Sequence, residues 1–168
     1  MTTNPKQGEG AALVRFREIE RRLPSLLDEL LDCRAYRRDE RPAVPADEGV
    51  YLFSEEDVHR YVGRTRNVNR RLGQHIWESS GENSAPFAFN IAKTEANRTG
   101  ADSEFAGTRA EVAAHPDFEP YFLAAKQRIR AMDFRFVKVS EPATAAIFEV
   151  YAAIALATEG EFNLFDTH

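Results

Sequence analysis

The stretch that decides the fold is GVYLFSEEDVHRYVGRTRNVNRRLGQHI, residues 49–76. It begins with two short runs rich in aromatic and β-branched residues, GVYLF and HRYVG, separated by a polar segment. This pattern predicts a β-hairpin with a longer loop. Side chains alternate between the two faces of a strand, so Tyr51 and Phe53 share one face. If Phe53 pairs with His59, Tyr51 lies directly opposite Tyr61 and the two phenols are neighbours.

A helix is expected directly after the hairpin. Thr65 or Asn67 can cap its first turn, because both side chains accept hydrogen bonds from backbone amides. An apolar stripe at a spacing of four residues predicts the buried face: Val68, Leu72 and Ile76. Arg71 and His75 share another face, one turn apart. The pattern therefore brings a cation and an imidazole close to the hairpin.

The segment before the hairpin is predicted to be helical. Apolar residues recur every three or four positions from Leu13 to Leu31, and Pro24 is expected to kink or restart that helix. Residues 34–48 are charged, contain two prolines and have no period, which indicates a connection. The helix can pack on the core or pair with a second chain. We favour packing within the chain and keep a homodimer through this helix as the alternative.

The segment after the hairpin and its helix predicts further helices and one more strand. Helices are expected over 87–98 and 118–130, and the last helix from Ser140, as its cap, to Gly160. The strand over 133–139 has apolar residues on both faces, which suits a strand covered on both sides. Helices therefore flank a small sheet.

One core is expected, since 168 residues with 43% hydrophobic side chains form a single domain. We place it over 49–168, with a helical insertion at 78–130, and assign 1–48 to an N-terminal helical extension and linker. The fold class is α/β of the α+β kind, with a small, mainly antiparallel three-stranded sheet.

The composition excludes several classes. No long apolar run free of charge is present, so a membrane span is not expected. The N-terminus lacks a basic start followed by an apolar stretch, which favours a cytoplasmic protein over a secreted one. A single cysteine, Cys33, cannot form an intrachain disulfide or a thiolate zinc site. His59, His115 and His168 show no metal-ligand spacing.

Positive charge is concentrated locally, although the chain carries a net charge of −5. Residues 58–77 contain five arginines and no acid, and a second basic cluster lies near residue 128. Such clusters suit phosphate contacts, although solvated faces give the same pattern. The candidate nucleic-acid-binding residues are Arg60, Arg66, Arg70, Lys126, Arg128 and Arg130.

Glu149 is the only charged residue between Pro142 and Thr158, in a helix of Ala, Ile, Val, Phe and Leu. A buried carboxylate costs several kcal/mol unless it is compensated. It must therefore be protonated, paired with an arginine of the basic segment, or bound to a metal. The residue by itself does not choose among these three.

Six positions in a fixed order resemble the GIY-YIG nuclease family. They are GVY at 49–51, YVG at 61–63, Arg71, His75, Glu149 and Asn163. The resemblance covers 49–77 and about 140–165, and valine for isoleucine in both tripeptides conserves packing volume.

The resemblance implies a metal-dependent endonuclease that hydrolyses DNA phosphodiester bonds with one metal ion, with RNA as an open alternative. Tyr51 is then the general base, Tyr61 holds water or phosphate, and Arg71 clamps the phosphate. Glu149 is the metal ligand for Mg²⁺ or Mn²⁺. One carboxylate is a weak cage for such a hard ion, so metal binding is expected to need the substrate.

Three further roles follow from the same resemblance. His75 assists proton transfer or contacts phosphate, Arg64 lowers the pKa of a neighbouring phenol, and Asn163 braces the end of the metal-bearing helix. A phenol has an ordinary pKa of about 10, so a tyrosine base needs nearby cations. Without the motif, buried tyrosines and a lone histidine are more often structural.

Other functions stay open at this point. A catalytically silent module of the same fold could hold nucleic acid with the arginines alone. A partner-binding or regulatory domain would suit the acidic total and the leucine-rich helix. A different metal nuclease built on Asp117 and Asp133 lacks the lysine such sites carry.

Overall fold

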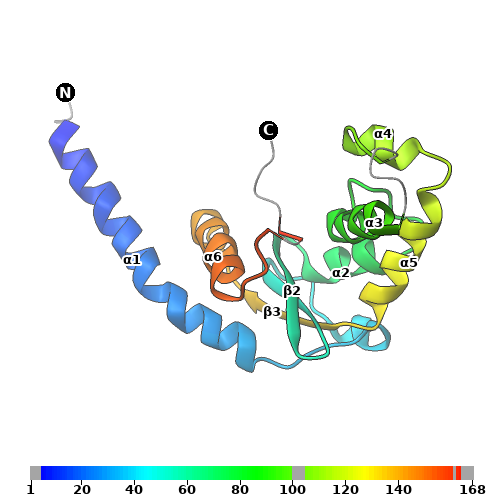
Figure 1. Ribbon diagram of the computed structural model, residues 1–168. Coiled ribbons are helices and arrows are strands. Elements are labelled where there is room, and N and C mark those ends of the chain that lie inside the picture. Colours follow the sequence, from blue (N-terminus) through cyan, green and yellow to red (C-terminus); the bar gives the residue numbers. More distant parts are fainter. Residues whose placement is uncertain (1–4, 100–104, 161, 164–168) are drawn as a thin grey trace.

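The computed structural model describes residues 5–99, 105–160 and 162–163. A three-stranded antiparallel sheet forms its centre (Figure 1). The strands are β1 (Gly49–Glu55), β2 (Val58–Thr65) and β3 (Asp133–Lys138), in the order β2-β1-β3. The predicted α+β fold with a small antiparallel sheet is confirmed. His168 and the end of the predicted domain from residue 164 onward lie outside the described residues.

The register of the hairpin differs from the prediction. Tyr51 pairs with Gly63, and Phe53 pairs with Tyr61, with an irregularity between Phe53 and Ser54. The loop is a tight two-residue turn instead of a longer one, and its residues Glu56 and Asp57 both have positive φ, as a twisted hairpin turn requires. The two phenols are therefore diagonal neighbours rather than direct partners, with ring centroids 6.2 Å apart.

One face of the sheet is covered by α1 (Pro5–Asp32) and α6 (Pro142–Ala155) (Figure 1). The second half of α1 packs there through Ile19, Leu23, Leu26 and Leu30. The helix does not restart at Pro24, since it continues unbroken through that residue. Pro24 lies on the exposed side, where water can satisfy the freed carbonyl. The first half of α1 diverges from α6 and leaves Leu13, Val14 and Phe16 at least half exposed.

The other face carries the helices between β2 and β3 (Figure 1). They are α2 (Val68–Ile76), α3 (Pro86–Thr99), α4 (Arg109–Ala114) and α5 (Glu119–Arg130). The expected apolar stripe of α2 is buried. Phe87 of α3 and Ile129 of α5 join Tyr51 and Phe53 in one apolar cluster. The segment predicted as an insertion at 78–130 is thus part of the core beneath this face.

The connection before β1 is partly ordered into secondary structure. It contains the short 3₁₀ helix η1 (Arg38–Ala43). Tyr36 forms two backbone hydrogen bonds with Phe134, of 2.7 and 2.8 Å, so the connection extends the sheet beside β3.

The boundaries of α6 also differ from the prediction. Its N-cap is Glu141, whose side chain accepts a hydrogen bond from the Thr144 amide, instead of Ser140. The helix ends at Ala155, five residues before Gly160, because Ala157 adopts a positive φ of 52° that a right-handed helix cannot continue. Among the helices in the described ranges, none combines the length and hydrophobicity that a bilayer crossing requires.

Candidate active site

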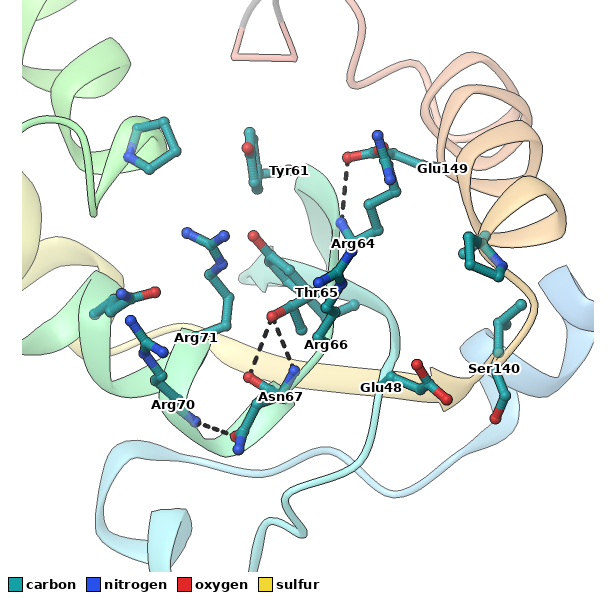
Figure 2. Close-up of a pocket in the computed structure, with 16 residues that line it drawn as sticks. Glu48, Tyr61, Arg64, Thr65, Arg66, Asn67, Arg70, Arg71, Ser140 and Glu149 are labelled. Atoms are coloured by element: carbon teal, nitrogen blue, oxygen red, sulfur yellow. Dashed lines mark hydrogen bonds and ion pairs between the residues drawn. The ribbon is translucent and has the colours of Figure 1, made fainter.

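A cleft of about 610 Å³ lies between α2 and α6, at the outer edge of the hairpin. Figure 2 shows the side chains of Tyr61, Arg64, Arg71 and Glu149 gathered around it. Its charged and phenolic lining consists of Glu48, Tyr51, Tyr61, Arg64, Arg66, Arg70, Arg71 and Glu149. Two strands and two helices therefore bring most of the predicted site residues to one hollow.

The free edge of β2 is closed by side chains from the C-terminal part of the chain. Asn163 accepts from the amide of Val62 at 2.8 Å and donates to its carbonyl at 2.6 Å. Asn163 also accepts from the Thr158 hydroxyl at 2.9 Å, beyond the end of α6. Two residues along, Glu149 accepts from the amide of Arg64 at 3.2 Å. In an edge strand, the backbone groups that point away from the sheet recur at every second residue. The same edge of β2 therefore binds both Asn163 and Glu149.

Glu149 forms an ion pair with Arg64. The Arg64 Nε donates to Oε2 of Glu149 at 2.7 Å, and the Glu149 side chain is 22% exposed. Burial raises the pKa of Glu149, and the hydrogen bonds and charge of Arg64 act in the opposite direction. The arginine partner considered from sequence is therefore present, and the carboxylate still faces the cleft.

Tyr51 lies on the central strand, and its ring covers Gly63. A Cβ atom at Gly63 would lie 2.5 Å from Cζ of Tyr51, so only glycine leaves room for the ring. The hydroxyl lies 3.1 Å from Nε2 of His75, within hydrogen-bond distance. His75 is fully buried behind the tyrosine, and its Nδ1 has no hydrogen-bond partner within the described residues. His75 is placed to orient Tyr51, out of reach of a phosphate in the cleft.

Burial dominates the ionisation of these rings. Desolvation raises the pKa of Tyr51 well above its ordinary value and raises that of Tyr61 to about 12. Desolvation also lowers the pKa of His75 to about 3. In the unliganded protein at neutral pH both phenols are protonated and the imidazole is neutral.

Arg71 extends from α2 into the cleft, on the side of Tyr61 (Figure 2). One terminal nitrogen donates to the carbonyl of Ser84 at 3.3 Å, while the buried Nε has no partner within the described residues. Its charge lowers the pKa of both Tyr51 and Tyr61. The side chain is thus held in place and keeps donors for an anion.

The start of α2 adds positive charge to the same wall. Asn67 caps the helix by accepting from the amide of Arg70 at 2.8 Å, and Thr65 bonds the amide of Asn67 at 3.1 Å. Arg66 and Arg70 both line the cleft and are exposed. Phosphate contacts from these two arginines fit their placement.

The remaining predicted nucleic-acid contacts lie elsewhere. Arg60 and Arg128 both pair with Glu55 at the hairpin turn, at 3.1 and 2.6 Å. Arg130 donates to the carbonyl of Ile76 at 2.8 Å. None of these three lines the cleft.

Lys126 requires a correction, because it is 1% exposed and not on the surface. Its ammonium donates to the carbonyl of Glu78 at 2.8 Å and to that of Ser80. A buried lysine whose ammonium donates to two backbone carbonyls holds the loop between α2 and α3, and it is not placed to contact a phosphate on the surface.

Within the described residues no group of three or more acidic, histidine or cysteine side chains could hold a metal ion. Glu149 supplies one carboxylate at an open, partly polar cleft. Such a donor fits a hard cation that keeps most of its waters and takes oxygen ligands from a phosphate. A fully protein-bound metal centre does not fit this site.

Three neighbours of the site were not singled out by sequence reasoning. Gln74 lines the cleft and lies one turn after Arg70, so helical spacing could have found it. Phe87 stacks on Tyr61 with ring centroids 4.6 Å apart, and Arg109 lowers the pKa of Tyr61. Both come from the segment after α2, whose weak pattern carries no signal for these contacts.

Comparison with known proteins gives one family. Residues 48–105 match the model of the GIY-YIG catalytic domain, which extends from just before β1 past the end of α3. Comparison with the curated proteins and with the solved structures gave no match. Nucleases of this family are endonucleases that generally use a divalent metal ion. Residues 48–105 of the chain are therefore similar to the catalytic domain of the GIY-YIG family.

Proposed function

We propose that the protein is an endonuclease that hydrolyses DNA phosphodiester bonds in the cleft between α2 and α6, with one divalent metal ion and Tyr51 as general base. One observation carries the proposal: Tyr51, Tyr61, Arg71 and Glu149 line the same cleft, although they come from the hairpin and two separate helices. Glu149 lies outside the segment that matches the family, so its position in the cleft is independent support.

Tyr51 would accept the proton of the attacking water at its Oη. Its raised pKa means that the hydroxyl holds its own proton until positive charge enters the cleft. Arg71 lowers this pKa, whereas Glu149 raises it. Neutralising Glu149 therefore favours loss of the phenol proton to solvent water in the cleft, which leaves a phenolate that can accept the proton of the attacking water. Nε2 of His75 keeps the oxygen in position.

Arg71 would bind the scissile phosphate. Its planar guanidinium can give two parallel hydrogen bonds to phosphate oxygens, on which negative charge builds in the transition state. The hydroxyl of Tyr61, protonated at neutral pH, donates a further hydrogen bond to phosphate or water. Arg66 and Arg70 would hold the flanking phosphates.

Glu149 would hold Mg²⁺ or Mn²⁺ with its carboxylate. A bound divalent cation supplies positive charge to a phosphate oxygen and to a coordinated water. Arg64 occupies the carboxylate in the unliganded protein and would have to share it or swing aside.

Cleavage of plasmid and single-stranded DNA in Mg²⁺, Mn²⁺ or EDTA tests the proposal. We expect cutting only with metal, and a loss of at least about 100-fold in Glu149→Gln and in Tyr51→Phe. Glu95→Gln is the matched control, because Glu95 pairs with Arg98 outside the cleft. Metal-independent cutting, or full activity of Glu149→Gln, would overturn the assignment.

RNA of the same sequence belongs in that assay, because phosphate contacts from arginines suit RNA as well as DNA. Binding without cleavage of every substrate would favour the catalytically silent module instead. The homodimer kept as the alternative for the N-terminal helix stays a proposal, supported by the exposed apolar residues of the first half of α1.

A further inference from the structure

A second pocket, of about 570 Å³, lies beside the C-terminal end of α2 and against η1. Three arginines and two acidic residues contribute to its lining, together with Trp77. Trp77 is 43% exposed, which is unusual for so large a ring. Neither the cleft nor the proposed reaction uses this pocket.

The tryptophan ring is held in a fixed position. The guanidinium carbon of Arg41 lies 4.6 Å from the ring centroid, in cation–π geometry. Arg41 is itself anchored on Asn69, donating to its side-chain oxygen at 2.7 Å. Gly73 makes room for the ring, since a Cβ atom there would lie 2.7 Å from Cζ2 of Trp77. An exposed aromatic ring anchored in this way is preorganised as a stacking platform.

The pocket continues the basic wall of the cleft along α2. Arg70 lines the cleft near the start of α2, and Trp77, the residue that caps the C-terminal end of this helix, follows seven positions later, about two helical turns along it. Two turns correspond to about 10 Å along the helix. Gln74 lies between them and faces the cleft. A nucleic-acid strand that leaves the cleft past Arg70 would therefore reach Trp77.

We propose that Trp77 and Arg41 form a stacking site for an unpaired base of the nucleic-acid substrate. This base belongs to a single-stranded region that flanks the cleaved bond. This inference rests on the proposed endonuclease function and names the substrate class, which is DNA with an unpaired region next to the cleavage site. Bases in a duplex are stacked on one another, whereas an unpaired base offers its face to an aromatic ring. Arginines around the ring attract the adjoining phosphates.

Trp77 is the only tryptophan of the chain, so its fluorescence reports directly on this pocket. The experiment uses the full chain with Glu149→Gln, in EDTA, so that no substrate is consumed. Three probes share one duplex: a blunt form, a form with a short single-stranded tail, and the tailed form with abasic sites in the tail. Fluorescence and anisotropy of labelled DNA are measured together.

We expect the tailed duplex to quench Trp77 and to bind about ten-fold more tightly than the blunt and abasic forms. Trp77→Leu should abolish that preference while leaving the affinity for the blunt duplex unchanged, and Trp77→Phe should keep most of it. Phe16→Leu, which changes an exposed aromatic residue on α1, is the matched control.

Tight binding of the tailed duplex with unchanged Trp77 emission would overturn this inference and leave the endonuclease proposal intact. The inference would also be overturned if Trp77→Leu preferred the tailed duplex as strongly as the protein that keeps Trp77. A normal quench without cleavage by the unmodified protein in metal would instead overturn the endonuclease proposal alone. Failure of every probe to bind would overturn both. If Trp77→Leu does not fold, two other measurements test the stacking site. They are the quenching of Trp77 emission in the Glu149→Gln protein and the affinities of Trp77→Phe for the tailed and blunt duplexes.

Discussion

Gly63 pairs with Tyr51 across the hairpin, and the tyrosine ring occupies the space in which a side chain at Gly63 would lie. The last residue of YVG therefore positions the hydroxyl that contacts His75. A glycine on one strand thus fixes a phenol on its neighbour.

Gly63→Ala should displace the Tyr51 ring and break its contact with His75. We expect cleavage to fall about 100-fold or more, with a loss of about 1–3 kcal/mol in the free energy of unfolding. Cleavage rates and denaturant unfolding measure the two effects. Gly81→Ala is the control, since nothing lies within 4 Å of a Cβ atom there. Undiminished cleavage by Gly63→Ala would show that this packing does not position the base.

His75 should make the protein sensitive to acid. Burial lowers its pKa from 6.5 to about 3, so the unfolded chain binds a proton below pH 6.5 that the folded chain refuses. The stability from this group is complete above pH 6.5 and declines as the pH falls toward 3, by a few kcal/mol at pH 4. Thermal unfolding of His75→Gln between pH 7 and 4 should show a weaker pH dependence than that of His115→Gln. Parallel curves would argue against a buried, neutral imidazole.

Arg64 should compete with a metal ion for Glu149. Because its Nε lies 2.7 Å from Oε2, we expect Arg64→Gln to bind Mn²⁺ a few-fold more tightly. Titration calorimetry or the electron paramagnetic resonance signal of free Mn²⁺ measures this affinity in the presence of a DNA fragment. Glu149→Gln should show no specific binding in the same titration. A weaker Mn²⁺ affinity in Arg64→Gln would mean that Arg64 supports the ion instead.

Lys126 should matter for stability and not for nucleic-acid affinity. Lys126→Met removes the donor of two carbonyls, those of Glu78 and Ser80, and we expect a loss of about 1–3 kcal/mol in unfolding free energy. Affinity for duplex DNA should stay within two-fold, whereas Arg70→Gln should weaken it and reduce its salt dependence. A large loss of affinity in a folded Lys126→Met protein would contradict this.

The first half of α1 should mediate self-association. Phe16 is 50% exposed on a helix that diverges from the core, so a second copy can bury it (Figure 1). We expect sedimentation equilibrium to detect a dimer at micromolar concentration and Phe16→Ser to shift it to monomer. A monomer at all accessible concentrations would refute the dimer.

The alternation of side chains along the strands and the four-residue spacing of apolar residues along the helix, both within residues 49–76, were enough to predict the hairpin, the following helix and the faces of both. Tyr51 and Phe53 do lie on the face that α2 covers. The register was wrong because a two-residue turn and a bulge next to Ser54 set it, and neither depends on hydrophobic alternation.

The sequence by itself determined which residues are chemically suited to the site, since the two tripeptides and the isolated Glu149 can be recognised without coordinates. Only the tertiary structure decided which partners the charged side chains have. It pairs Arg64 with Glu149 and buries Lys126. The physical reason is that composition and spacing act along the chain, whereas ion pairing and desolvation depend on which segments meet in space.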